Sequence, residues 1–140
     1  MSIFSIVIIY LMATLVFFAV DIAWLGFIAR DFYRNKLGNV VDVNIHWPAA
    51  IVFYLIYIAG ILIFAILPAL KTGSLQTAIV WGALFGFFTY ATYDLTNMAT
   101  IRKWPLKVVV VDMIWGTILS ATVAGVTFWV GSRLVKSGLL

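Results

Sequence analysis

Three aspartates, Asp21, Asp94 and Asp112, lie inside long apolar stretches of the sequence. A charged aspartate at the centre of a membrane helix costs about 2.5–3.5 kcal/mol on an insertion scale, so these side chains are expected to face protein rather than lipid. Buried carboxyl groups can carry protons, bind a cation, or act as a general acid and a general base. The chemistry that this sequence offers is therefore carboxyl chemistry.

The three carboxyls are predicted to lie in one layer of the membrane. Asp21 precedes the end of its apolar stretch by seven residues, and Asp94 precedes the end of its stretch by four. Asp112 follows the start of its stretch by seven residues, on a helix that runs in the opposite direction. At a rise of about 1.5 Å per residue, all three fall about 6–11 Å inside the same membrane boundary.

Aromatic side chains accompany the aspartates at helical spacing. Tryptophan follows aspartate by three residues in both Asp21-x-x-Trp24 and Asp112-x-x-Trp115, which places each pair on one helix face. Carboxylates with aromatic walls suit a cation, through charge and cation–π attraction. The alternative is structural, with each indole N–H satisfying a carboxylate on a neighbouring helix. The predicted binding residues are Asp21, Asp94, Asp112, Trp24, Trp115, Tyr54, Tyr57, Tyr90, Tyr93 and Asn97.

Small residues share the faces of two aspartates. Asp94 lies on the same helical face as the Gly82–Gly86 pair, and Asp112 lies on the same face as Gly116 and Ser120. Small residues four apart allow two membrane helices to approach closely. Both aspartates are therefore expected on packing faces.

Four apolar stretches are long enough to position these residues across a bilayer, whose core needs about 20 residues of helix. They cover roughly residues 3–28, 47–70, 75–98 and 105–130. They predict an all-α fold, a four-helix transmembrane bundle that forms one integral membrane domain over residues 1–140. The first stretch is expected to be a retained helix rather than a signal peptide, because no basic residue precedes it.

The composition agrees with a membrane protein and excludes several kinds of site. Apolar residues make up 65% of the chain and charged residues 10%, against about 45–50% and about 25% in soluble proteins. There is no cysteine and the single histidine is His46, so we expect no cofactor and no resident metal. The net charge of +4 comes from basic residues in short connections, which indicates contact with the lipid bilayer rather than nucleic acid.

Two patterns concern topology. Each half of the sequence contains an aspartate, a basic connection and a Trp-Pro pair, which predicts two helical hairpins related as a parallel repeat. The alternative is two unrelated hairpins that use the same interface residues. The excess of lysine and arginine in loops 29–46 and 99–104 and just after them predicts that these loops are cytoplasmic and that both termini lie outside.

The sequence resembles a family of small bacterial four-helix inner-membrane proteins that is classed as a domain of unknown function. The segments that carry the resemblance are Asp21-x-x-Trp24, His46-Trp47-Pro48-Ala49, Thr89-Tyr90-x-x-Tyr93-Asp94-Leu95-Thr96-Asn97 and Val111-Asp112-x-x-Trp115-Gly116. The resemblance covers essentially the whole chain. It implies four helices in a bacterial inner membrane, and it implies no activity.

The residues support three functional hypotheses. The preferred one is a small transporter or permeation protein whose aspartates bind a proton, a metal cation or an organic cation in a water-accessible cavity. The second is a membrane enzyme acting on a lipid or isoprenoid, which needs two carboxyls together beside a lipid-facing opening. The third is a structural or accessory subunit, in which neighbouring side chains satisfy every carboxyl and no cavity remains. We also consider a homodimer.

Overall fold

Residues 1–38 and 46–140 are described by the structure, a computed structural model of the 140-residue chain. Every regular element in these residues is helical, and no strand occurs among them, which confirms the all-α prediction. In chain order the elements are α1 (Ile3–Ala23), η1 (Trp24–Ile28), α2 (Arg30–Leu37), α3 (Trp47–Ile61), η2 (Leu62–Ile66), α4 (Leu67–Thr72), α5 (Leu75–Thr100) and α6 (Leu106–Lys136), where η1 and η2 are short π-helical turns.

Three helical runs are long and apolar enough to cross a membrane. They are Ile3–Ile28, Trp47–Thr72 and Leu106–Lys136. The third run, α6, has 31 residues and a length of about 46 Å, which exceeds a hydrocarbon core of about 30 Å. It therefore continues past the predicted end at residue 130 and brings Arg133 and Lys136 to its last turn.

Local signals in the sequence define the helix ends. The side chains of Ser2 and Ser74 accept hydrogen bonds from backbone N–H groups three residues later, at 3.1 and 3.2 Å, and so cap α1 and α5. His46 caps α3 in the same way through Nδ1, at 3.3 Å from the N–H of Ala49. Gly73 ends α4 in the left-handed conformation, with φ of 68°, which glycine adopts without strain.

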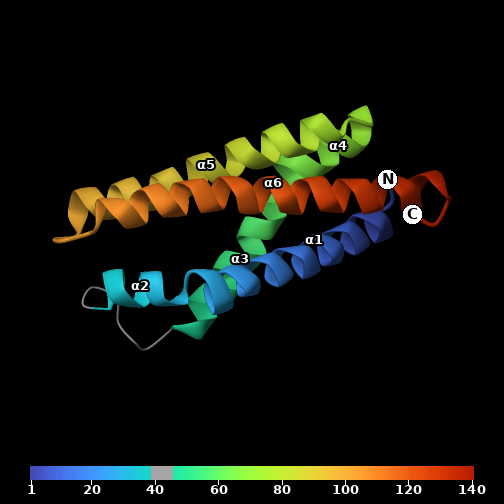
Figure 1. Cartoon of the computed structure of the whole chain (residues 1–140). Coiled ribbons are helices and arrows are strands. Elements are labelled where there is room, and N and C mark those ends of the chain that lie inside the picture. The colour runs from blue at the N-terminus through green and yellow to red at the C-terminus, as the bar shows by residue number, and fades with distance from the viewer. Residues whose placement is uncertain (39–45) are drawn as a thin grey trace.

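The two ends of the molecule differ in what they contain (Figure 1). The N- and C-termini lie at one end, and α2 lies at the other end near the turn between α5 and α6. Helices α5 and α6 run antiparallel side by side, and α1 packs against α6. The run from α3 to α4 crosses steeply behind α6, and η2 contacts α5, so the two hairpins are packed differently.

Glycines bring α5 and α6 into backbone contact. A Cβ atom added to Gly82 would lie 2.7 Å from the carbonyl oxygen of Ser120, and one added to Gly86 would overlap the carbonyl of Gly116. Gly82, Gly86, Gly116 and Ser120 are all buried. The predicted small-residue packing faces on these two helices are thereby confirmed.

The π-helical turn η2 lies just before a proline. Pro68 has no N–H to donate to the carbonyl four residues earlier, and its ring would clash with that carbonyl in a regular α-helix. The wider turn of η2, from Leu62 to Ile66, occurs directly before this position. A local change in helical register is the usual accommodation of such a defect, and here it lies where the α3–α4 run passes α6.

A short helix occupies part of the first predicted connection. The sequence predicts a loop over residues 29–46, but Arg30–Leu37 form α2. Phe32, Tyr33 and Leu37 pack against a buried cluster of Trp104, Val108 and Val109 at the start of α6. The remainder of that predicted loop, residues 39–45, lies outside the described residues.

Candidate carboxyl site

The carboxyls of Asp94 and Asp112 face each other between α5 and α6. Close contacts of Gly82 with Ala124 and of Tyr90 with Gly116 fix the register of the two antiparallel helices. One further turn along each helix, from Tyr90 to Asp94 and from Gly116 to Asp112, brings the two aspartates opposite each other. Each carboxyl is accordingly part of the polar surroundings of the other.

Asp94 is buried without a hydrogen bond. Its side chain is 0% exposed, and neither carboxyl oxygen has a hydrogen-bond partner. The indole of Trp104 lies nearby, but its N–H is also buried and unpaired. A buried polar group without a partner lowers the free energy of unfolding, so Asp94 costs more folding stability than any other side chain of this region. A group of this kind requires an explanation beyond stability.

Asp112 is held by a side chain from α2. The hydroxyl of Tyr33 donates a hydrogen bond to the Asp112 carboxyl, and the Tyr33 oxygen accepts one from Nε1 of Trp24 at 3.3 Å. The ring of Trp24 stacks on Trp115 with a centroid distance of 4.3 Å and an interplanar angle of 8°. Burial, followed by the hydrogen bond to Asp112, raises the pKa of the Tyr33 hydroxyl above its ordinary value. Tyr33 therefore remains a proton donor at neutral pH.

Asp21 has a different set of neighbours. It is buried on α1, and its polar surroundings are the indole of Trp115 and the hydroxyl of Tyr54. The Trp115 N–H nevertheless has no hydrogen-bond partner, so it lies near the carboxyl without bonding to it. Asp21 is linked to the Asp94–Asp112 pair through α6, because Trp115 lies one helical turn from Asp112.

A cavity of about 350 Å³ adjoins Asp112. Its walls come from α3, α5 and α6, and the lining residues are Phe53, Tyr57, Thr89, Tyr90, Tyr93 and Asp112. The Tyr57 hydroxyl lies 2.8 Å from Ser120 Oγ and accepts a hydrogen bond from Thr89 Oγ1 at 3.3 Å, which fixes the orientation of one aromatic wall. Phe53 and Tyr93 are 50% and 57% exposed, so the cavity opens toward the outer surface between α3 and α5.

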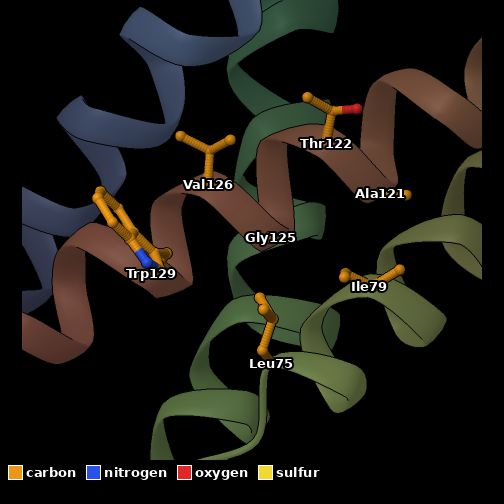
Figure 2. Close-up of a pocket in the computed structure, with 7 residues that line it drawn as sticks. All are labelled: Leu75, Ile79, Ala121, Thr122, Gly125, Val126 and Trp129. Carbon is orange, nitrogen blue, oxygen red and sulfur yellow. The ribbon is translucent and has the colours of Figure 1, made fainter.

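A larger groove lies elsewhere and is apolar (Figure 2). It has a volume of about 530 Å³ and lies between the beginning of α5 and the second half of α6. Figure 2 shows Leu75 and Ile79 on α5 on one side of the groove, with Gly125 and Val126 on α6. No titratable residue lines this groove, so it has the character of a lipid-facing depression rather than of a site for proton or cation chemistry.

The predicted binding residues fall into three groups. Four of them line the cavity: Tyr57, Tyr90, Tyr93 and Asp112. Asp94 lies opposite Asp112, and Asn97 lies beside Tyr93. The third group consists of Asp21 and its neighbours Trp115 and Tyr54, together with Trp24, which stacks on Trp115.

Sequence reasoning omitted three residues of this region from the predicted site. Phe53 precedes Tyr57 by four residues, so the helical repeat alone could have placed it on the same face. Thr89 precedes Tyr93 by four residues in the same way. Tyr33 gave no such signal, because its position depends on how a connecting segment folds back onto α6.

The acidic residues that the structure describes do not form a multi-ligand metal centre. Within residues 1–38 and 46–140, no group of three or more histidine, cysteine, aspartate or glutamate side chains is placed to hold a metal ion. The Asp94–Asp112 pair brings only two carboxyls together. A tightly held divalent metal such as Ca²⁺ binds about six to eight oxygen ligands, so the pair suits a proton or a monovalent cation better.

A family of proteins matches most of the chain. Residues 6–129 match the family described as a predicted membrane protein, DUF2177. This range contains all ten predicted binding residues and also Tyr33, Phe53 and Thr89. No curated protein and no solved structure matches the chain.

Proposed function

The chain belongs to the DUF2177 family of predicted membrane proteins, and we propose that it exchanges protons for a cation at its Asp94–Asp112 pair. The observation that carries this proposal is a cavity lined by Asp112 and three tyrosines, next to an Asp94 carboxyl whose two oxygens are unpaired. A carboxylate supplies charge to a bound cation, and aromatic faces supply cation–π attraction. An organic cation of moderate size suits a cavity of about 350 Å³.

The pair of carboxyls holds one exchangeable proton in this proposal. Among the described residues, no lysine or arginine contributes to the surroundings of Asp94 or Asp112. Two facing carboxylates without a counter-ion repel each other, so the resting pair holds one proton. A cation that enters the cavity replaces this proton as the source of positive charge, which couples the two movements.

The proposal includes a fourth crossing of the membrane, by α5. This helix has 26 residues, the same length as the first two candidate spans, but it is more polar. Three of its threonines donate hydrogen bonds to backbone carbonyls four residues earlier in the same helix: Thr92, Thr96 and Thr100. Such bonds satisfy the hydroxyls internally and lower the cost of placing them in lipid.

The remaining topology is also proposed rather than observed. A four-helix bundle in a bacterial inner membrane would place the α2 end in the cytoplasm and both termini outside, in accordance with the distribution of lysine and arginine. The parallel repeat of two hairpins stays a prediction from sequence. The two hairpins are packed differently, because α5 and α6 lie side by side whereas α3 crosses the bundle steeply. A homodimer likewise stays a prediction.

Flux through liposomes tests the exchange. We expect purified protein in liposomes with an imposed proton gradient to move the fluorescent organic cation ethidium, and Asp112→Asn to lower that flux at least about tenfold, as for loss of a positioned proton-transfer group. The matched control is Tyr10→Phe, which removes a phenol that donates to the carbonyl of Leu55, away from the cavity. Equal flux for Asp112→Asn and the wild-type protein contradicts the proposal.

One observation favours a second candidate function. The cavity beside the paired carboxyls opens outward at Phe53 and Tyr93, which is the arrangement that an enzyme acting on a lipid or isoprenoid requires. In that case Asp94 and Asp112 would act as general acid and base. Mass spectrometry of bacterial lipid extract incubated with the protein distinguishes the two: a new product that depends on Asp112, without ethidium flux, supports the enzyme.

A further inference from the structure

We infer that Tyr33 on α2 closes the Asp94–Asp112 site toward the loop end of the protein, and that the site opens to water on that side when Tyr33 leaves Asp112. The functional role of this closure rests on the proposed exchange. The closure itself can be tested without a transport measurement. It adds a positioning residue, outside the long helices, to the carboxyl pair.

The contact is specific rather than a general packing contact. The Tyr33 hydroxyl donates to the Asp112 carboxyl and at the same time accepts from Trp24 Nε1 at 3.3 Å. Trp24 is held in turn by stacking on Trp115, which belongs to the same helix as Asp112. The tyrosine oxygen is therefore oriented by two partners, and the carboxyl receives its hydrogen bond from a fixed direction.

Apolar contacts extend the closure around this hydrogen bond. Phe32, Tyr33 and Leu37 cover the cluster that contains Val109, which is buried three residues before Asp112 on α6. The outer side of α2 carries Arg30, Asp31, Arg34, Asn35 and Lys36, all exposed. The helix thus presents one side to α6 and the other to water, as expected for a short element lying over a site entrance.

The way in which α2 is joined to α1 allows it to move as a unit. Between them lie the π-helical turn η1 and Ala29, whose backbone has φ of −108° and ψ of 1° and interrupts the helix. Apart from Trp24, which stacks on Trp115, every residue of η1 is exposed. The closure is therefore held from the α6 side, by the apolar contacts of Phe32, Tyr33 and Leu37 and by the Tyr33–Asp112 hydrogen bond, which is the one that involves a carboxyl.

Cysteine accessibility tests the closure directly, because the chain contains no native cysteine. Val109→Cys is a near-isosteric reporter under α2, and its reaction with a charged, membrane-impermeant maleimide is followed by mass spectrometry. We expect the reaction to be slow with Tyr33 present, and about tenfold faster or more with Tyr33→Phe, because a hydrogen bond to a charged group is lost. Tyr33→Ala, which also removes the ring, is expected to be faster still.

Two controls keep the result interpretable. Val123→Cys lies in the fully buried core of α6 away from α2, and its reaction rate is expected to stay unchanged, whereas general loosening would raise both rates. Tyr10→Phe is expected to leave the Val109→Cys rate unchanged. The inference is overturned if neither Tyr33 variant accelerates the Val109→Cys reaction. If acceleration occurs but wild-type protein carries no ethidium flux, the closure stands and the exchange proposal fails.

Discussion

Leucine in place of Asp94 is expected to stabilise the protein and to abolish cation flux. The Asp94 side chain is fully buried, and both of its oxygens lack a hydrogen bond. Leucine has a similar size and removes the penalty of burying an unsatisfied polar group, which is about 1–3 kcal/mol. The same substitution leaves Asp112 without the second carboxyl whose charge makes the pair hold a proton, so exchange should stop.

Asp112→Leu is the matched substitution with the opposite expected sign. Its carboxyl accepts the hydrogen bond of Tyr33, so leucine there leaves that hydroxyl without its acceptor. The expected loss is about 1–3 kcal/mol. Thermal unfolding in detergent, followed by tryptophan fluorescence, measures both changes, and liposome flux measures function. If Asp94→Leu destabilises the protein as much as Asp112→Leu does, Asp94 is a structural partner and the structural-subunit hypothesis is favoured.

Valine in place of Gly86 is expected to destabilise the protein by about 3 kcal/mol, the upper part of the usual range for overpacking. A Cβ at Gly86 would overlap the backbone carbonyl of Gly116, which cannot rotate away as a flexible side chain could. The helices α5 and α6 would have to separate. Because the same contact sets the register of Asp94 against Asp112, flux should also fall although both carboxyls remain.

Gly26→Ala provides the control for Gly86→Val. A Cβ at Gly26 meets no atom within 4 Å, and alanine favours helical structure by up to about 1 kcal/mol over glycine. We expect a melting temperature equal to or slightly above that of the wild-type protein. A Gly86→Val protein that melts at the wild-type temperature would show that the close approach of α5 and α6 is not required.

Local patterns carried much of what could be predicted from the sequence. The contact between α5 and α6 could be predicted from small residues at helical spacing, which allow two helices to pack closely. On α5 these residues share a face with Asp94 (Gly82 and Gly86), and on α6 Gly116 shares a face with Asp112. Continuous apolar stretches likewise indicated membrane helices. These inferences needed only the helical period and the energetics of burial.

Features that depend on three-dimensional arrangement were not accessible in this way. The predicted common depth of the aspartates could not show that Asp94 faces Asp112 while Asp21 faces Tyr54 and Trp115, because depth leaves the rotation of each helix free. The steep crossing of α3 has no counterpart in composition. Tyr33 reaches Asp112 from 79 residues away in sequence, through a helix in a segment too short and polar to be recognised from hydropathy.

The burial of Asp94 where α5 packs on α6 has a consequence for biogenesis. Helix α5 contains Asp94, which has no hydrogen-bond partner, whereas α6 is a candidate span on its own and follows after a short turn. We expect α5 to remain at the membrane surface during synthesis until α6 emerges, and the two to enter the bilayer together as a hairpin. A nascent chain ending at Thr100 should leave α5 open to protease in isolated membranes, and one ending at Lys136 should protect it. Equal protection of α5 in both chains would contradict paired entry.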